Sequence, residues 1–265
     1  MARFHLEKWY VDVVDPTGRA LVGYSSTLRW AGLEVRHASL LLSEPGRAVG
    51  AQSTLRRVTA PEAEDDAIAW SLPLLDLEGR WSRHCASLSA ELFSTARGAV
   101  VWTCHAPRAA ARVRLGGVRL EGTGYVEQLR LTLVPWRLPI EALHWGRAIA
   151  DSCAVIWIDW RGADHSRRLV AVDDSVAQGA ELTDDGVTWA GTSLVRLGTR
   201  RTLREGTLGG SVATSLPAAL RRRLPARLLE VHEHKWVGQA SIRGAPANAI
   251  WEVVRWPASG RSPTA

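Results

Sequence analysis

A tyrosine and a glutamate lie two residues apart in a strongly alternating part of the sequence. We predict a strand over residues 124–133. Its period of two places Tyr125 and Glu127 on one face. The same face carries Leu129, Leu131 and Leu133. A sheet normally buries its apolar face, and burying an unpaired carboxylate is costly. Glu127 is therefore expected to be ion-paired, neutral with a raised pKa, or functional.

A carboxyl group kept neutral by burial can act as an acid. Hydration or cyclisation of an alkene needs such an acid to protonate carbon, apolar walls to hold the substrate, and groups that tolerate a passing carbocation. Aromatic faces stabilise cationic charge through their quadrupole, and the sequence has 13 tryptophans against two phenylalanines. We therefore predict Glu127 as the proton donor, with Tyr125 beside it.

Structural explanations exist for each of these residues. Glu127 could form an ion pair with an arginine of a neighbouring strand, which would hold it ionised and useless as an acid. Tyr125 could be a buried phenol that donates to a backbone carbonyl, and tryptophans more often pack in cores than surround cations. The environment of Glu127 discriminates between these explanations.

Composition indicates a soluble globular protein. The chain has 265 residues, of which 46% are apolar and 23% charged, and this is ordinary for folded domains. Neither a signal peptide nor an apolar run of membrane-spanning length is found. The cysteines, Cys85, Cys104 and Cys153, are isolated and odd in number. Free thiols of this kind are typical of a reducing compartment, so we predict a cytoplasmic protein.

The net charge is +6, because 31 arginines and two lysines, most of them scattered, exceed the 27 acidic residues by six. One dense run spans residues 221–223. Such a run is usually a solvated surface, with contact to an anionic partner or a peripheral membrane contact as the alternative. No recognition helix, zinc finger or RNA-binding motif accompanies it. We predict no nucleic-acid partner.

The elements that position these side chains read as strands with polar turns between them. The predicted strands cover residues 6–14, 20–30, 33–42, 81–88, 91–95, 99–105, 111–115, 118–133, 153–160, 187–190, 228–237 and 249–256. One helix is expected between Pro217 and Pro225. Two prolines interrupt the alternation in residues 135–140, after which the strand pattern starts again. We predict an all-β chain of two tandem antiparallel β-barrels with one or two short helices.

The predicted domains are residues 1–138 and 139–256, followed by a disordered tail, 257–265. Within the first domain, Glu7 shares a strand face with Trp9, so a second carboxylate is expected to point into the first barrel. Just past the hinge, where a pocket between two barrels would open, the chain carries further candidates for substrate binding. These are His144, Trp145, Arg147 and Trp157.

Three short segments resemble a known family. The opening EKWYVDVVDPTGRALV resembles the E-W-W-Y-F-D-A-x-x-x-D-G strand pair of carotenoid 1,2-hydratase (hydroxyneurosporene synthase) and its AttH-like relatives. The segment GTGYVE, residues 122–127, is similar to the G-x-G-Y-x-D/E element that closes their first domain. The segment LHWGRAIADSCAVIWIDWRG looks like the start of their second domain. These landmarks extend over about two thirds of the chain.

The resemblance implies two lipocalin-like β-barrels in tandem. Activities in the family include hydration of an isolated terpenoid C=C bond, and related lipocalin-like proteins act as cyclases or Diels–Alderases in natural-product biosynthesis. Hydratases typically follow the tyrosine with His-Asp-His, where this chain has Val126, Glu127 and Gln128. The acid is retained and the two flanking histidines are absent.

Two functional hypotheses result. The first is a hydratase-like or cyclase-like enzyme that acts on a hydrophobic terpenoid or polyketide by acid–base catalysis, with Glu127, Tyr125 and Glu7 as catalytic candidates and Trp9 among the substrate-binding ones. The second is a non-catalytic lipocalin-like protein that binds an apolar ligand. Neither requires a cofactor. His232 and His234 have a His-x-His spacing, but no further ligand is identifiable, so we predict no metal.

Overall fold

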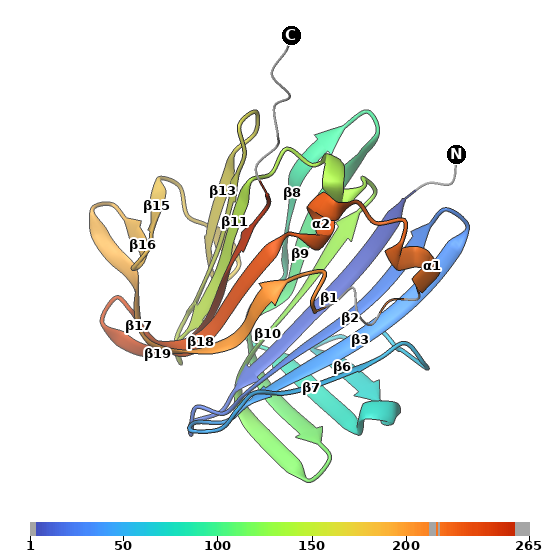
Figure 1. Ribbon diagram of the computed structural model, residues 1–265. Coiled ribbons are helices and arrows are strands. Elements are labelled where there is room, and N and C mark those ends of the chain that lie inside the picture. Colours follow the sequence, from blue (N-terminus) through green and yellow to red (C-terminus); the bar gives the residue numbers. More distant parts are fainter. Residues whose placement is uncertain (1–3, 212–215, 217, 258–265) are drawn as a thin grey trace.

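The computed structural model describes residues 4–211, 216 and 218–257. Two antiparallel sheets, formed by successive halves of the chain, lie against each other (Figure 1). The first extends from residue 5 to residue 131 and the second from residue 142 to residue 255. The predicted division between residues 138 and 139 falls in the connector between them. The prediction of an all-β chain with short helices is confirmed.

The N-terminal sheet has ten strands: β1 (His5–Val14), β2 (Ala20–Trp30), β3 (Leu33–Ser43), β4 (Gly50–Thr54), β5 (Glu62–Ala63), β6 (Ala67–Leu72), β7 (Leu77–Arg83), β8 (Leu88–Thr95), β9 (Gly98–Leu115) and β10 (Val118–Leu131). Their order is β4-β3-β2-β1-β10-β9-β7-β6-β5, and β8 also pairs with β9. The first strand therefore pairs with the last, and both lie in the middle of the sheet.

The C-terminal sheet repeats this arrangement with nine strands: β11 (Ala142–Ile149), β12 (Ala154–Arg161), β13 (Arg167–Val172), β14 (Ser175–Val176), β15 (Ala180–Thr183), β16 (Gly186–Trp189), β17 (Thr192–Thr207), β18 (His232–Ile242) and β19 (Ala245–Arg255). Their order is β14-β13-β12-β11-β19-β18-β17-β16-β15. Again the first strand pairs with the last.

Each sheet buries both of its faces. The N-terminal core, which includes Trp9, Val11 and Trp81, lies inside the first sheet, and the C-terminal core, which includes Trp157 and Trp251, lies inside the second. A third cluster, the central core, draws residues from both sheets. Alternation along β1 sends Trp9 into the N-terminal core and its neighbour Tyr10 into the central core.

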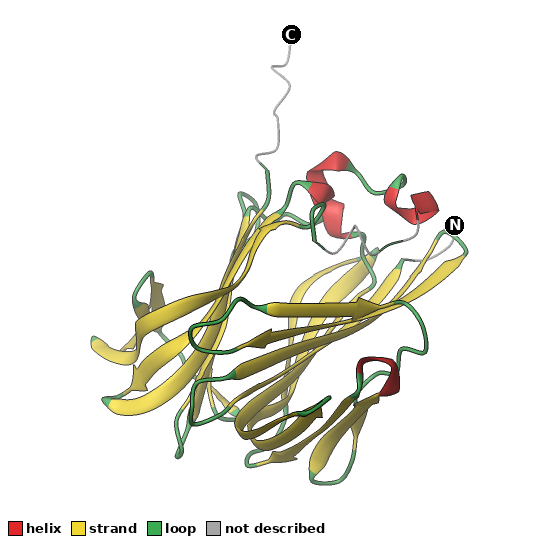
Figure 2. Cartoon of the chain, turned by 60° about the horizontal axis from the view of Figure 1, so that its bottom comes forward, coloured by secondary structure: helices red, strands yellow, loops and turns green. Residues whose placement is uncertain are grey.

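Short helices occupy one end of the molecule, α1 (Ala218–Arg221) and α2 (Ala226–Leu229) (Figure 2). Two 3₁₀ turns, η1 (Pro73–Leu75) and η2 (Pro135–Arg137), complete the helical elements of the described residues. The predicted helix corresponds to α1, although Pro217 lies outside the described residues. No helix in the described ranges is long and apolar enough to cross a membrane.

Several predicted boundaries were wrong. The expected strand over residues 228–237 begins only at residue 232, because Pro225 opens a second helical turn, α2. The strand β6 (Ala67–Leu72) had no prediction, and the predicted strands at 99–105 and 111–115 are one strand, β9. The tail 258–265 lies outside the described residues.

Irregular pairing between β9 and β10 determines which face of the sheet the neighbouring side chains point to. The register shifts on both sides of Val126, so that β9 carries an extra residue at each step. These shifts let Cys104 face the central core while Ala106 faces the N-terminal core, as bulges do when they re-aim a strand. Gly124 is required just before them, because a Cβ atom there would lie 2.6 Å from the Trp81 ring.

A buried ion pair joins the two sheets. Arg147 of β11 donates to both carboxylate oxygens of Asp12 on β1, with its terminal nitrogen 2.5 Å and its Nε 3.1 Å from them. Both side chains are 0% exposed. Arg147 also donates to the carbonyl of Asn248, and Tyr10 donates to Asp12. Each nitrogen of the guanidinium and each oxygen of the carboxylate thus has a hydrogen-bond partner.

Removing one partner of this pair is expected to be strongly destabilising. Arg147→Met leaves the Asp12 carboxylate buried without its cation, which costs roughly 3–5 kcal/mol. Chemical denaturation measures the change. As a control, Arg29→Met removes an ion pair with Glu34 whose side chains are 57% and 41% exposed. This substitution should change the free energy of unfolding by no more than about 1 kcal/mol. Equal effects of the two substitutions would contradict the role assigned to the buried pair.

Candidate functional site

A cavity of about 390 Å³ lies between the two sheets. Residues of β1, β2, β9 and β10 line it on one side, and residues of β11, β12, β17 and β19 on the other. Leucines of the helical segment, Leu224, Leu228 and Leu229, also contribute. Its wall is predominantly apolar and aromatic, with a few polar side chains, which is the usual make-up of a small-molecule site.

Glu127 lies on this wall, and one of its oxygens collects three hydrogen bonds. Trp102 Nε1 donates to Oε2 at 2.5 Å, the Tyr125 hydroxyl at 2.7 Å and Trp145 Nε1 at 3.0 Å. Trp102 and Tyr125 come from the N-terminal sheet and Trp145 from the C-terminal sheet. Among the described residues, no side chain hydrogen-bonds to Oε1 and no arginine or lysine forms a salt bridge with Glu127.

Burial raises the pKa of Glu127 above its ordinary value. The hydrogen bonds from Trp102 and Tyr125, the charge of Lys8 and the hydrogen bond from Trp145 oppose this shift without cancelling it. The neutral acid is therefore favoured relative to a solvated glutamate. Burial likewise raises the pKa of Tyr125 well above its ordinary value, so this phenol remains a donor. The ion pair with an arginine that would have disabled Glu127 is not formed within the described chain.

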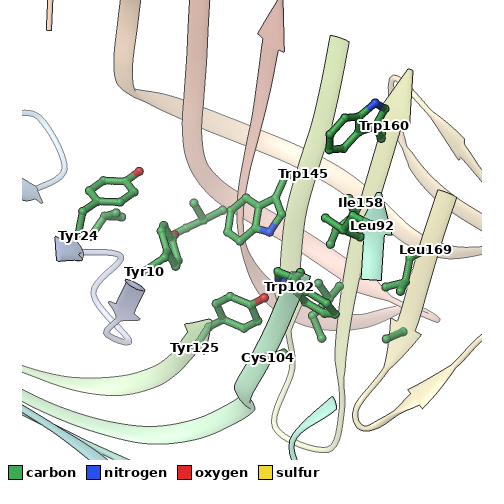
Figure 3. Packing of buried hydrophobic residues seen from close by; sticks show 14 of the residues in the cluster. Tyr10, Tyr24, Leu92, Trp102, Cys104, Tyr125, Trp145, Ile158, Trp160 and Leu169 are labelled. Carbon is green, nitrogen blue, oxygen red and sulfur yellow. The ribbon is translucent and has the colours of Figure 1, made fainter. Parts of the chain in front are cut away.

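Aromatic rings pack edge to face around this carboxyl group. Figure 3 shows Tyr125, Trp102 and Trp145 converging, with Tyr10 beside them. The Tyr10 and Trp145 ring centroids are 4.9 Å apart, and those of Tyr125 and Trp145 are 5.8 Å apart. Trp160 lies farther along the same wall. Ring faces and edges thus surround the space in front of Glu127.

A buried lysine supports this aromatic group from behind. Lys235 of β18 is 1% exposed, forms a salt bridge with Glu252 of β19, and lies 4.8 Å from the Trp145 ring centroid and 5.0 Å from that of Tyr10. The charge of Glu252 raises the pKa of Lys235 despite its burial. Lys235 is therefore a fixed cation, held between its carboxylate and two rings.

The structure brings four of the predicted site residues together. Glu127 and Trp145 line the cavity, and Tyr125 is fully buried beneath Glu127. Arg147 follows two residues after Trp145 on the same face of β11 and binds Asp12 instead of lining the cavity. Its position supports a structural contact that holds Trp145 against the N-terminal sheet.

The other four predicted residues lie on the opposite faces of their strands. Glu7 accepts hydrogen bonds from Trp9 and Gln128 on the far face of the N-terminal sheet. Trp9, predicted to bind substrate, points into the N-terminal core, and Trp157 packs in the C-terminal core. His144 is also absent from the cavity wall. Because these four residues do not reach the cavity, they have no part in the site described below.

Several residues of the cavity wall, and Lys235 behind it, were not predicted. Trp102 was not singled out, and its distance from Glu127 in the sequence gives no signal of their contact. Lys235 lies between His234 and Trp236, whose stacked rings face away from the cavity. Tyr10 and Tyr24 alternate with apolar residues on β1 and β2, so a search for polar groups on apolar strand faces would have found them.

Comparison with known proteins gives a likeness in structure alone. No protein-family profile matches the sequence, and no curated protein sequence matches it. Among solved structures, the chain is similar to one described as an AttH from Nitrosomonas europaea, at 12% identity and a TM-score of 0.54, covering 96% of this chain and 92% of the other. It is also similar to kievitone hydratase from Nectria haematococca, at 8% identity and a TM-score of 0.55, covering 95% and 88%.

A third similar structure is that of CghA, at 11% identity and a TM-score of 0.52, covering 97% of this chain and 89% of the other. At these identities the likeness establishes the fold. The chain has the two-domain lipocalin-like fold of these proteins, as its opening and GTGYVE segments led us to expect.

The raised pKa of Glu127 predicts a pH dependence of stability. Because the folded state holds this proton more tightly than the unfolded state, the contribution of Glu127 is fully present below its unfolded pKa and is lost as the pH rises through the folded value. Wild type should therefore lose stability relative to Glu127→Gln as the pH rises from about 4.3, the ordinary glutamate value. Denaturation of both proteins between acidic and neutral pH measures the difference. A difference that grows in favour of wild type with rising pH would show a lowered pKa instead.

Proposed function

We propose that this protein binds a hydrophobic terpenoid or polyketide in the intersheet cavity and catalyses hydration, cyclisation or isomerisation of a C=C bond, with Glu127 as the acid. The observation that supports this most is the environment of Glu127. It faces an apolar cavity, its pKa is raised by burial, and no cation pairs with it in the described chain. Burial favours the neutral carboxyl group, which is the form that can donate a proton to carbon.

The hydrogen bonds to Glu127 define where its proton is held. Three donors contact Oε2, which leaves Oε1 as the oxygen that carries the proton in the neutral acid. The same donors stabilise the carboxylate that forms when the proton leaves. Proton donation from Oε1 and stabilisation of negative charge at Oε2 are thus separated on one side chain.

The reaction balances with water or a second alkene as the other reactant. The O–H bond of Glu127 breaks as a C–H bond forms, and the π electrons of the alkene are consumed, which leaves a carbocation. Water from solvent or a second C=C bond of the ligand captures the cation, and the surplus proton returns to Glu127. The rings of Tyr10, Trp145 and Trp160 provide the aromatic surface near the cation.

The similar structures include proteins whose names support this class of activity. One is named a hydratase, kievitone hydratase, and another structure is that of CghA with Sch210972. Hydration of a carotenoid is the more specific form of the proposal, and its support is the resemblance of the opening and GTGYVE segments. The cavity itself supports an apolar substrate without selecting its skeleton.

Binding without catalysis is the second candidate function. The observation that favours it is the number of donors on Oε2, because hydrogen bonds to a carboxylate stabilise the ionised form. If these bonds dominate, Glu127 is a charged anchor in an apolar pocket. The same cavity then serves as a carrier site.

Substitution of Glu127 separates the two functions. Native mass spectrometry of the protein purified from its own host identifies a retained ligand. The amounts of this ligand and of related compounds are then compared between extracts of hosts that carry wild type and hosts that carry Glu127→Gln. Loss of a general acid is expected to lower the rate about 10²–10⁴-fold. The precursor then accumulates, and its mass differs from that of the product by one water for hydration and by nothing for cyclisation or isomerisation.

Glu121→Gln is the matched control, because Glu121 lies on the same strand with its side chain 71% exposed. This variant should leave the product profile unchanged. Identical profiles and retained ligands for wild type and Glu127→Gln would exclude acid catalysis by Glu127 and leave the binding function.

A further inference from the structure

Two residues of the N-terminal sheet that line the cavity each have a buried polar atom without a hydrogen-bond partner among the described residues. These atoms are the hydroxyl of Tyr24 on β2 and Nε2 of His37 on β3. Both residues line the cavity and are 7% exposed. Leaving a buried hydroxyl or ring nitrogen unpaired costs free energy. A ligand that supplies the missing hydrogen bonds would recover it.

Both groups are neutral in the folded protein. Burial raises the pKa of Tyr24 above its ordinary value and lowers that of His37, and the charge of Arg204 lowers the latter further. Tyr24 therefore offers a hydroxyl, and His37 offers an imidazole that carries a single proton. These two groups suit hydrogen bonding to an oxygen function.

Cations surround Tyr24. Lys8 Nζ lies 4.9 Å and Arg204 Cζ 5.1 Å from its ring centroid, and Lys235 Nζ lies 5.7 Å away. Arg204 is 3.4 Å from Glu233, and Lys235 is bound to Glu252. Lys8 lines the cavity without a salt bridge to any described carboxylate. The positive charge at this end therefore exceeds the negative charge by one.

The register of the sheet separates this group from Glu127. Glu127 on β10 pairs with Tyr10 on β1, Tyr10 pairs with Tyr24 on β2, and the strand beyond β2 carries His37. At about 4.8 Å per strand, Tyr24 is about 10 Å from Glu127 along the sheet; His37 pairs with Ser26, two residues beyond Tyr24, and is about 16 Å from Glu127. In Figure 3, Tyr24 lies on the far side of Tyr10 from Tyr125 and Trp145.

We propose that Tyr24, His37 and Lys8 form a second polar subsite that binds an oxygen acceptor group of the ligand, a carboxylate or a carbonyl. The ligand is then an amphiphile, an apolar chain with its oxygen function at the Tyr24 end and its reacting C=C bond at Glu127. This inference rests on the proposed function and adds the orientation of the substrate. Lys8 supplies the charge, and Tyr24 donates the hydrogen bond that selects an oxygen acceptor.

Isoprenoid probes test the subsite without knowledge of the natural ligand. Farnesoic acid and farnesene share a chain whose extended length is comparable to the separation of Tyr24 from Glu127, and they differ in the carboxylate. Quenching of tryptophan fluorescence in the full-length protein gives both dissociation constants. We expect farnesoic acid to bind wild type at least 10-fold more tightly than farnesene.

Three substitutions locate the cause of that preference. Tyr24→Phe removes the hydroxyl and keeps the ring, and His37→Leu removes the imidazole. Each substitution should weaken the binding of farnesoic acid about 10-fold and leave the dissociation constant of farnesene unchanged. Tyr10→Phe is the matched control, because the Tyr10 hydroxyl is already bound to Asp12, and it should leave the ratio of the two constants unchanged.

Thermal unfolding of the free protein tests whether these changes in affinity come from a loss of stability. Since the Tyr24 hydroxyl has no hydrogen-bond partner in the described part of the chain, Tyr24→Phe should not lower the melting temperature. Tyr10→Phe should lower it, because it removes a hydrogen bond to a buried carboxylate. The proposed subsite would be overturned if Tyr24→Phe were less stable than wild type, or if it bound both probes less tightly.

The outcomes also separate this inference from the proposed function. Equal binding of the two probes to wild type would overturn the subsite and leave an apolar site with Glu127 as its acid. Failure of both probes to bind would overturn the inference together with the apolar site. A lost preference in Tyr24→Phe and His37→Leu, with the preference kept in Glu127→Gln, supports the subsite whether or not Glu127 is the acid.

Discussion

The ion pair between Asp12 and Arg147 is the contact on which the position of the site depends. It is fully buried, it joins the middle strands of the two sheets, and its remaining donors and acceptors are used by Tyr10 and Asn248. Two charges in an apolar interface tolerate little displacement, because either one alone would be costly to bury. Arg147 thereby fixes β11 against β1, and Trp145 two residues earlier is held in reach of Glu127.

The cavity follows from how the two sheets use their faces. Each sheet encloses its own core with one face and turns the other toward its partner, so the central core is built by both. Large aromatic side chains at this junction do not fill it completely. A carboxyl group placed there is shielded from water, yet it borders open space. Burial can then raise its pKa without removing its access to a ligand.

Alternation in the sequence predicted strands at β1, β2 and β10 correctly, and it placed Tyr125 and Glu127 on an apolar face of β10. It could not tell which of two apolar faces turns toward the other sheet. Trp9 and Tyr10 are neighbouring aromatic residues, and only the packing of distant strands assigns one to the N-terminal core and the other to the cavity. Trp102 was beyond prediction for the same reason, since its contact with Glu127 depends on the shifted register of β9.

Pairing of the first strand with the last has a consequence for how the protein forms. The middle of the N-terminal sheet forms only when residues 118–131 are available to pair with residues 5–14. In the same way, β11 can pair with β19 only after β19 has been synthesised. Such long-range pairing closes large loops and is slow to form. During synthesis, β1 leaves the ribosome long before its central partner, and its apolar faces stay uncovered in the meantime. The β1–β10 pairing, which positions Glu127, and the β11–β19 pairing, which positions Trp145, are therefore completed last in each half. The site exists only once folding of both halves is finished.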